Sequence, residues 1–481
     1  MIVRRFYEPQ LAQYSYLIGC GATHSAIVID PVRDAEQYVA AAAQANVRIT
    51  HVTETHIHAD FLSGTRELVA RTGAKMLLSG EGVPEWRYGF AATDDAQLLR
   101  NGDMLDVGRI RVTAQHTPGH TPEHLSFLIK DLATSEEPVA IATGDFVFVG
   151  DVGRPDLLER AANETGTMDA SARQLFASLG RIRKLPDYLQ IWPGHGAGSA
   201  CGKSLGDMPS STVGYERLAN WALSERDVDT FVERVLEGQP EAPAYFGIMK
   251  RLNRDGPPVL GNRGDPPEPP AETLAALGHA GALVVDIRSP ERFARAHIPG
   301  TLNIPWGSSF TTLAGSLLPY DHDLYLLADE RGNALEAARA LSLIGLDRVA
   351  GMFDEKALIV WVEGGQALSR IRQFTPAEVI ERVAANSVML VDVRSQSEWE
   401  QGHHPSARHI PLGDLPRALA SLPRDRPVAV HCQAGTRSAV AASLLSAASI
   451  EAVNVPAGWA GIDALRNGAN GSEALSPSRV S

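Results

Sequence analysis

Two segments in the second half of the chain repeat each other, and this repeat constrains the fold more than any other feature. Residues 284–289 (VVDIRS) match residues 390–395 (LVDVRS), 106 positions further along. Residues 325–341 match residues 429–445 at an offset of 104, which a two-residue difference in the intervening loop explains. Such a period predicts two consecutive copies of one domain. In each copy a short apolar, β-branched run precedes an Ala/Leu-rich helical pattern, which is typical of a parallel α/β domain.

Changes in composition indicate where the domains end. Residues 256–270 hold six prolines and three glycines, too many for the interior of a helix or strand, so we predict a linker there. Residues 375–378 (TPAE) have Thr at the N-cap, Pro next and Glu at the third helical position, the residues of a helix start. We therefore predict domains at 1–255, 271–372 and 373–470, followed by a tail at 471–481.

The first domain has a different pattern from the two copies. Alternating apolar residues at 14–18 and 25–30 favour a hairpin, and residues 47–55 predict another strand. Helical patterns follow at residues 35–44 and 64–71. Strands followed by helices, twice over, favour an αββα sandwich of two sheets between helices.

Four loops of the first domain carry histidine or aspartate directly after a predicted strand. They are THIHAD (55–60), TPGH (117–120), TGD (143–145) and PGHG (193–196). Loops at strand ends often carry functional side chains, and Pro or Gly keeps the last three of these segments out of regular structure. Imidazole and carboxylate groups bind metals. We therefore predict a metal site at one edge of the domain, and we expect His56, His58 and Asp60 to converge on one point.

In this order the four loops resemble the motifs of the metallo-β-lactamase superfamily, over residues 1–255. Thioester hydrolases of that superfamily, of the glyoxalase II type, hold two metals and usually need a histidine directly after Asp60, where this chain has Phe61. An apolar ring cannot bind a metal, which argues against a complete second metal site. Two imidazoles and one carboxylate with open positions are the ligands of non-haem Fe(II) in oxygen chemistry. The residues that can supply them are His56, His120 and Asp145.

Residues 143–156 (TGDFVFVGDVGRPD) resemble the persulfide dioxygenases, in which an arginine near the substrate follows the aspartate ligand by nine residues. The resemblance implies one Fe(II) per chain in the first domain, held by His56, His120 and Asp145. It places Arg154 near the substrate. The residues that would orient ligands or waters are His58, Asp60 and His195. Family members often keep a histidine after that Asp, so Phe61 is a departure from the pattern.

The chain has only three cysteines, Cys20, Cys201 and Cys432, which cannot form a disulfide framework and suit a reducing cytosol. Cys201 lies in a Gly/Ser loop just past His195. A thiol in a flexible loop beside a metal edge indicates a substrate-entry loop, and the alternative is a buried small residue in a turn. Cys20 lies between two glycines of a hairpin, and we expect it not to be catalytic.

Cys432 opens a loop between a predicted strand, residues 428–430, and a helix that we expect to begin near Ser438. A thiol in this place faces backbone N–H groups and the positive end of the helix, which stabilise a thiolate. Arg437 adds a positive charge after four intervening residues. Cys-dependent phosphatases have five, so residues 374–470 resemble instead the rhodanese family of sulfurtransferases. The resemblance implies that Cys432 accepts sulfane sulfur as a persulfide and passes it on.

The middle copy has no thiol in the corresponding place. Ala328 aligns with Cys432, and Asp329 and Glu330 follow it where an anion would bind. This copy cannot transfer sulfur through a cysteine persulfide, and it resembles a pseudo-rhodanese. We expect it to serve spacing, docking or oligomer contacts.

Almost the whole chain resembles bacterial fusion proteins that join a persulfide dioxygenase, a pseudo-rhodanese and a rhodanese. The resemblance implies a sulfide-detoxifying enzyme in which a low-molecular-weight persulfide and O2 give sulfite at the iron, and Cys432 transfers sulfur to sulfite to give thiosulfate. It also implies a homo-oligomer. Glutathione, coenzyme A and cysteine all remain open as the thiol carrier. The alternatives are a glyoxalase II-like thioester hydrolase fused to a sulfurtransferase and a non-catalytic persulfide carrier.

Composition excludes several other classes of protein. The formal net charge of -13 argues against nucleic acid or an anionic membrane as the main partner, although a locally basic pocket remains compatible with it. The chain is 44% hydrophobic and 21% charged, an ordinary globular composition. It has no run of apolar residues long enough for a membrane helix and no signal-peptide pattern at its start, so we predict a cytoplasmic protein.

Overall fold

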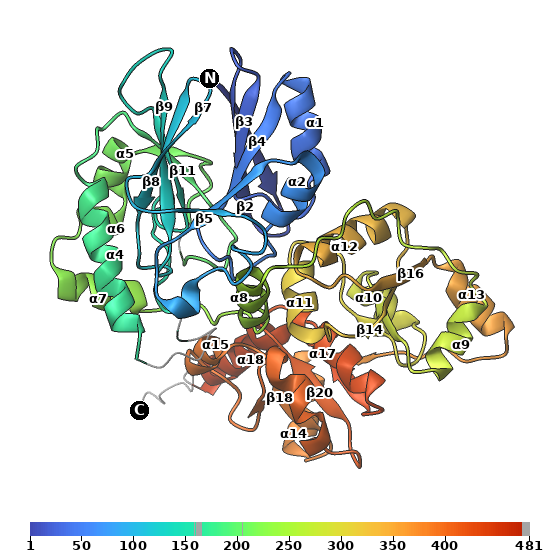
Figure 1. Cartoon of the computed structure of the whole chain (residues 1–481). Coiled ribbons are helices and arrows are strands. Elements are labelled where there is room, and N and C mark those ends of the chain that lie inside the picture. Colours follow the sequence, from blue (N-terminus) through green and yellow to red (C-terminus); the bar gives the residue numbers. More distant parts are fainter. Residues whose placement is uncertain (158, 160–165, 204, 474–481) are drawn as a thin grey trace, which may run out of the picture. The chain divides into compact units, whose positions relative to one another are not determined.

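The computed structural model describes residues 1–157, 159, 166–203 and 205–473 (Figure 1). It divides the chain into two compact units, Met1–Gly264 with Ala340–Gly345 and Asp265–Arg339 with Leu346–Ser481. The units divide inside the segment predicted to be a linker, and residues 256–270 form no helix or strand.

The first unit contains two six-stranded sheets. In the first sheet β1–β3 pair antiparallel and β3–β6 pair parallel. Its strands, in spatial order, are β1 (Ile2–Glu8), β2 (Gln13–Cys20), β3 (Ser25–Ile29), β4 (Arg48–Thr53), β5 (Lys75–Ser79) and β6 (Gln97–Leu99). The second sheet has the order β12 (Ser211–Thr212), β11 (Gln190–Pro193), β10 (Ala140–Gly144), β9 (Leu125–Asp131), β8 (Ile110–His116) and β7 (Met104–Val107).

The core of the first unit lies between these sheets and under the helices. Side chains of β2 and β3, such as Ile18 and Ile27, pack against side chains of β8 and β9, such as Val112 and Phe127. Helices α4 and α7 cover the outer face of the second sheet, and α1 and α2 lie beside the first (Figure 1). The helices are α1 (Glu36–Gln44), α2 (Thr65–Thr72), η1 (Pro84–Trp86), α4 (Met168–Ile182), α5 (Val213–Ala219), α6 (Trp221–Ser224), α7 (Val228–Leu236) and α8 (Phe246–Asp255). The predicted αββα sandwich is confirmed.

The second unit contains two parallel sheets, one for each copy of the repeat. The first has the order β14 (Leu302–Asn303), β13 (Leu283–Asp286), β15 (Leu324–Leu327) and β16 (Val349–Phe353). The second has the order β19 (Arg408–His409), β18 (Met389–Asp392), β20 (Val428–His431), β21 (Ala452–Asn454) and β17 (Arg372–Gln373). The first four strands of the two orders correspond one to one, which confirms the duplication.

Helices flank both sheets of this unit. In the first copy they are α9 (Thr273–His279), α10 (Pro290–Arg295), α11 (Phe310–Leu317), α12 (Arg331–Leu343) and α13 (Lys356–Glu363). In the second copy they are α14 (Pro376–Ala384), α15 (Gln396–Glu400), η2 (Leu412–Asp414), α16 (Leu415–Ala418), η3 (Leu419–Ser421), α17 (Thr436–Ala447) and α18 (Gly458–Glu473). The predicted helix start at Thr375 is confirmed, because Thr375 and Glu378 form a capping box. Of the predicted tail, residues 471–473 continue α18 and residues 474–481 lie outside the described residues.

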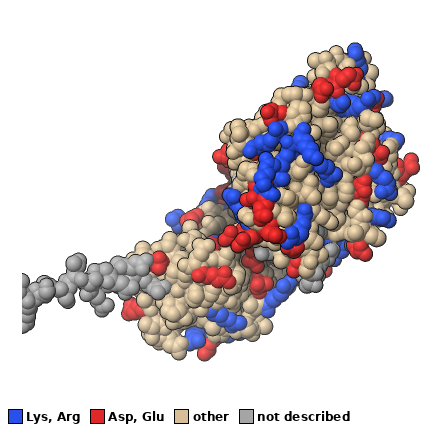
Figure 2. Space-filling model, turned by 90° about the vertical axis from the view of Figure 1, so that its left-hand side faces the viewer, with Lys and Arg blue, Asp and Glu red and all other residues tan. Residues whose placement is uncertain are grey.

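The surface of the chain carries charges of both signs. Figure 2 shows one face on which Lys and Arg side chains gather in a patch, although the chain as a whole has a net charge of -13. Among the described residues, no helix combines the length and the apolar character needed to cross a bilayer.

Candidate functional site

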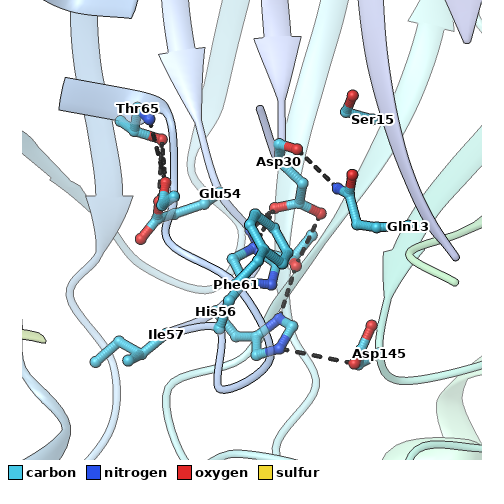
Figure 3. Close-up of polar contacts among 12 residues, drawn as sticks. Gln13, Ser15, Asp30, Glu54, His56, Ile57, Phe61, Thr65 and Asp145 are labelled. Atoms are coloured by element: carbon cyan, nitrogen blue, oxygen red, sulfur yellow. Dashed lines mark hydrogen bonds and ion pairs between the residues drawn. The ribbon is translucent and has the colours of Figure 1, made fainter. Parts of the chain in front are cut away.

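Three of the predicted side chains meet at the strand ends of the first unit. His56 follows β4, His120 follows β8 and Asp145 follows β10. The Nε2 atoms of His56 and His120 lie 3.9 and 3.6 Å from Oδ2 of Asp145. All three side chains are at most 2% exposed, and Figure 3 shows His56 turned toward Asp145. Three donor atoms this close together can bind one cation.

Neighbouring groups fix the orientation of both imidazoles. Nδ1 of His56 is 2.9 Å from Oγ1 of Thr55, and Nδ1 of His120 donates to the carbonyl oxygen of Arg154 at 3.1 Å. With Nδ1 engaged, each ring presents Nε2 to Asp145. Burial lowers the pKa of both histidines, and for His56 the neighbouring histidines lower it further. The neutral imidazole that burial favours is the form that binds a metal.

Asp145 shows that the pocket suits a cation. Both of its carboxylate oxygens are buried and accept no hydrogen bond from the described residues. A buried carboxylate that accepts no hydrogen bond is costly in a protein interior, and a metal ion would remove that cost. Gly194 leaves room beside it, since a Cβ there would come within 2.6 Å of Oδ1 of Asp145.

A second group of buried donors adjoins the first. Asp60, His195 and Cys201 offer an oxygen, a nitrogen and a sulfur that lie close enough to bind one ion. Nε2 of His195 is 3.2 Å from Oδ2 of Asp60 and 3.5 Å from Oδ1 of Asp145. Burial, together with the nearby charges of Asp60 and Asp145, raises the pKa of Cys201. The chain has Phe61 where glyoxalase II-type hydrolases usually have a histidine ligand. Cys201 adds a sulfur donor to this group, and the sequence did not reveal that combination.

The expected convergence of His56, His58 and Asp60 is wrong for His58. Nε2 of His58 lies 3.2 Å from Oδ1 of Asp30, a buried residue directly after β3. Burial alone would lower the pKa of His58, but Asp30 and other nearby carboxylates outweigh it and raise it to about 9. Asp30 also accepts hydrogen bonds from the backbone N–H and hydroxyl of Thr55. His58 therefore braces the loop through Asp30, and Figure 3 shows the dashed contacts that Asp30 makes.

Arg154 lies in the interior and uses its donors within the protein. Its guanidinium donates to both oxygens of Asp156, at 2.9 and 2.8 Å, and to the carbonyls of Ala200 and Pro240. Because its own carbonyl accepts from His120, Arg154 connects that histidine with the segment that carries Cys201. These contacts give Arg154 a positioning geometry, and its place near the substrate stays a prediction of the resemblance.

Residues that the sequence did not single out also hold the ligand loop. The side chain of Asn253, on α8, donates to the carbonyls of His58 and Phe61 and accepts from the N–H of Ser63. A carboxylate oxygen of Glu123 accepts from the N–H of Ile57 at 2.8 Å. Both are buried polar residues far along the chain from this loop, and nothing local in the sequence indicates their role.

The thiol loop lies in the second unit. Cys432 follows β20 and is 2% exposed, and its sulfur accepts a hydrogen bond from the N–H of Gly435 at 3.1 Å. Gly435 has a positive φ of 100°, which favours glycine, and α17 begins at the next residue, two positions earlier than predicted. A backbone donor and a helix N-terminus at a sulfur stabilise its thiolate form.

Arg437 is bound to a carboxylate as well as lying near the thiol. Its Nη1 and Nη2 each donate to Glu398 at 2.7 Å. Burial opposes ionisation of Glu398, but Arg437 and the donors of Ser395 outweigh it and hold the pKa of Glu398 at about 2. The positive charge that the sequence predicted beside the thiol is present, but it is paired.

Comparisons with known proteins assign both parts of the chain to families. The Metallo-beta-lactamase superfamily matches residues 9–195, and the Rhodanese-like domain matches residues 269–361 and 375–465. A crystal structure of a metallo-beta-lactamase from Staphylococcus aureus is 41% identical, with a TM-score of 0.68, and the match covers 73% of this chain and 99% of that chain. This chain belongs to the metallo-β-lactamase superfamily. It also carries two rhodanese-like domains.

Relatives within the superfamily carry two different activities in their names. The cytoplasmic hydroxyacylglutathione hydrolase of Arabidopsis thaliana is 32% identical over 51% of this chain and 88% of its own length. The mitochondrial persulfide dioxygenase ETHE1 of Bos taurus is 28% identical over 47% of this chain and 76% of its own length. The superfamily domain is thus homologous both to a protein named as a hydroxyacylglutathione hydrolase and to one named as a persulfide dioxygenase.

The first rhodanese-like domain has Ala328 where the second has Cys432. Ala328 is buried at the end of β15, and its N–H donates to the carbonyl of Phe353. Asp329, the next residue, pairs with Arg292 at 3.3 Å. The loop therefore keeps its place in the fold without a nucleophile.

Proposed function

We propose that this chain is a non-haem iron persulfide dioxygenase joined to a rhodanese-type sulfurtransferase. The observation that carries the proposal is the buried set of His56, His120 and Asp145, whose donor atoms face one another while neither oxygen of Asp145 accepts a hydrogen bond from the described residues. These residues would hold the iron. Bound there, Fe(II) supplies open coordination positions and electrons for O2. Overall, a persulfide, O2 and water give a thiol and sulfite.

The protein's own groups prepare this site in three ways. Thr55 and the carbonyl of Arg154 orient the imidazoles of His56 and His120. The pair of His58 with Asp30 braces the loop and keeps a proton on a buried imidazole. Burial of the whole set excludes bulk water, which protects a reactive persulfide.

Cys432 would carry the second half of the reaction. Its thiolate attacks the outer sulfur of a persulfide, the S–S bond breaks, and the carrier thiol leaves with a proton. Sulfite then attacks the outer sulfur of the Cys432 persulfide, which gives thiosulfate and restores the thiolate. The N–H of Gly435, 3.1 Å from the sulfur, stabilises the negative charge at the start and end of the cycle.

A second candidate is a thioester hydrolase with two metals. The group of Asp60, His195 and Cys201 favours it, because an oxygen, a nitrogen and a sulfur donor suit zinc. Metal analysis of the purified full chain separates the candidates. One iron per chain supports the dioxygenase, and two zinc ions with thioester turnover in the absence of O2 would refute it.

Oxygen uptake tests the proposal directly. Iron-loaded full-length protein is given glutathione, coenzyme A or cysteine persulfide, and O2 consumption is recorded. We expect uptake with at least one of them and a loss of about 100-fold or more in Asp145→Ala, since one of three ligands is gone. Asp106→Ala, at an exposed ion pair on β7, is the matched control. Uptake that survives in Asp145→Ala would overturn the proposal.

A further inference from the structure

The guanidinium of Arg437 lies between a carboxylate and the thiol of Cys432. Both of its terminal nitrogens donate to Glu398, each at 2.7 Å. Glu398 and, more weakly, Cys432 raise the pKa of Arg437, so this guanidinium interacts with both groups. The guanidinium of Arg437 therefore already has an anionic partner before any substrate arrives.

Glu398 is held in this position by its own helix. Its Oε2 accepts hydrogen bonds from the N–H and the hydroxyl of Ser395, each at 3.0 Å. The bond from the N–H of Ser395, together with one from the N–H of Glu398 to the hydroxyl oxygen of Ser395, forms a capping box at the start of α15. The side chain of Glu398 is 27% exposed. Because Ser395 fixes this carboxylate and Arg437 binds it through two hydrogen bonds, the pair is more rigid than an ordinary surface ion pair.

The other arginine beside the loop is neutralised in the same way. Arg394 donates to both oxygens of Asp392 and also to Oε1 of Gln433, a residue of the thiol loop. Within the described part of this domain, the two guanidinium groups that contact loop side chains therefore each have a carboxylate partner. An anion that approaches Cys432 meets backbone donors such as the N–H of Gly435, but it meets no uncompensated arginine from this pair.

We propose that Glu398 is a specificity-determining residue of the Cys432 site. By neutralising Arg437 it weakens the binding of dianionic sulfur compounds, thiosulfate above all, relative to neutral or singly charged persulfides. This inference rests on the sulfurtransferase role proposed for Cys432. The consequence is that sulfur transfer runs toward thiosulfate, because thiosulfate that forms at the loop is released in preference to returning its sulfur to Cys432.

The first rhodanese-like domain supports this assignment by what it lacks. The positions that align with Glu398 and Arg437 hold Arg292 and Asn333. Arg292 pairs instead with Asp329 and Glu355. The pair of Glu398 with Arg437 thus occurs in the domain that has a thiol and not in the domain that has none.

Alkylation of Cys432 in the full-length protein measures the charge that an incoming molecule meets. Iodoacetate is an anion and iodoacetamide is neutral, so the ratio of their rates at Cys432, followed by mass spectrometry of its peptide, reports the local potential. Glu398→Gln keeps the capping oxygen and removes the charge, and we expect the ratio to rise about three- to tenfold at low salt. Arg437→Gln should lower it. Glu400→Gln, on the same helix at a carboxylate that accepts a hydrogen bond from Gln396, should leave it unchanged.

An unchanged or lower ratio in Glu398→Gln would overturn the proposal. A disturbed fold would change the rates with iodoacetate and iodoacetamide by the same factor and would leave their ratio as in wild type. Opposite changes of the ratio in Glu398→Gln and Arg437→Gln therefore identify an effect of charge.

Turnover then tests the consequence for substrates. In Glu398→Gln we expect the KM for thiosulfate to fall about three- to tenfold, whereas kcat/KM for a persulfide donor changes less than about twofold. Equal changes for both donors would refute the specificity role. If wild-type protein transfers sulfur from neither donor, the proposed function fails, while the alkylation ratio still decides whether Glu398 controls the charge.

Discussion

In both rhodanese-like domains a buried aspartate at the end of the first core strand binds the arginine two residues later. The shortest distances are 2.6 Å for Asp286 with Arg288 and 2.7 Å for Asp392 with Arg394. Each arginine also donates to a backbone carbonyl on the segment after the next helix, that of Ala296 or Gly402. These contacts hold the segment after the first core strand in both copies. They therefore stabilise the fold and are not specific to sulfur chemistry.

The two domains differ where the thiol loop meets the neighbouring helix. The second domain has Cys432, with Arg437 on the loop side and Glu398 on the helix. The first has Ala328, with Asp329 on the loop and Arg292 on the helix, so the signs of the charges are exchanged. After the duplication both domains have kept the buried ion pairs that the fold needs, whereas the charges around the loop differ between them. We therefore expect substitutions at the framework and at the loop to have separable effects.

The largest expected effect concerns the thiol itself. Cys432→Ser should lower sulfur transfer from thiosulfate to cyanide by about 1,000-fold or more, because the nucleophile is lost. Ala328→Cys in that variant should not restore it, since Asp329 and Glu330 would repel both a thiolate and an anionic donor. Thiocyanate formation measures both. Recovery of more than a few per cent of wild-type activity by the double variant would contradict the claim that the charges around Ala328 prevent sulfur transfer.

The framework pairs should show effects of similar size in both domains. Asp286→Asn and Asp392→Asn each leave a buried guanidinium without its counter-charge, and we expect each to lower the free energy of unfolding by about 3 kcal/mol. Denaturant unfolding of the full chain measures this, with Asp321→Asn at an exposed pair as the control. If only one of the two variants is destabilised, the shared framework role is wrong.

The smallest effect is the pH dependence of the pair of Glu398 with Arg437. The pKa of Glu398 is lowered from 4.5 to about 2, so the ionised carboxylate stabilises the fold above pH 4.5, and this contribution is lost as the pH falls from 4.5 toward 2. After allowance for solvent screening we expect about 1 kcal/mol. Unfolding at pH 6 and pH 3 should therefore show a smaller acid loss in Glu398→Gln than in wild type or Glu400→Gln. Parallel losses in all three proteins would contradict it.

Much of the fold could be predicted from the sequence because its signals are local. The strands and helices predicted between residues 14 and 71 lie within two residues of their predicted bounds, since alternation, helical periodicity and turn residues specify them, whereas β1 was not predicted. The duplication was visible because both copies keep the same residues around the first core strand. The meeting of His56, His120 and Asp145 was predictable, because each follows a strand that the sequence predicts.

The remaining features depend on contacts between distant parts of the chain. His58 turns to Asp30, a residue of a neighbouring strand end, and Asn253 reaches the ligand loop from α8. The pair of Glu398 with Arg437 joins two helices that the sequence places far apart. Such contacts depend on how the elements pack, and no local pattern encodes their geometry.

Oxygen uptake and product analysis in one experiment test the division of labour between the metal centre and Cys432 most directly. Iron-loaded wild type and Cys432→Ser receive the same persulfide, and O2, sulfite and thiosulfate are measured together. We expect Cys432→Ser to consume O2 within about twofold of wild type, because the metal centre and Cys432 belong to different compact units. We also expect this variant to release sulfite in place of thiosulfate. Loss of O2 uptake together with loss of thiosulfate in Cys432→Ser would contradict it.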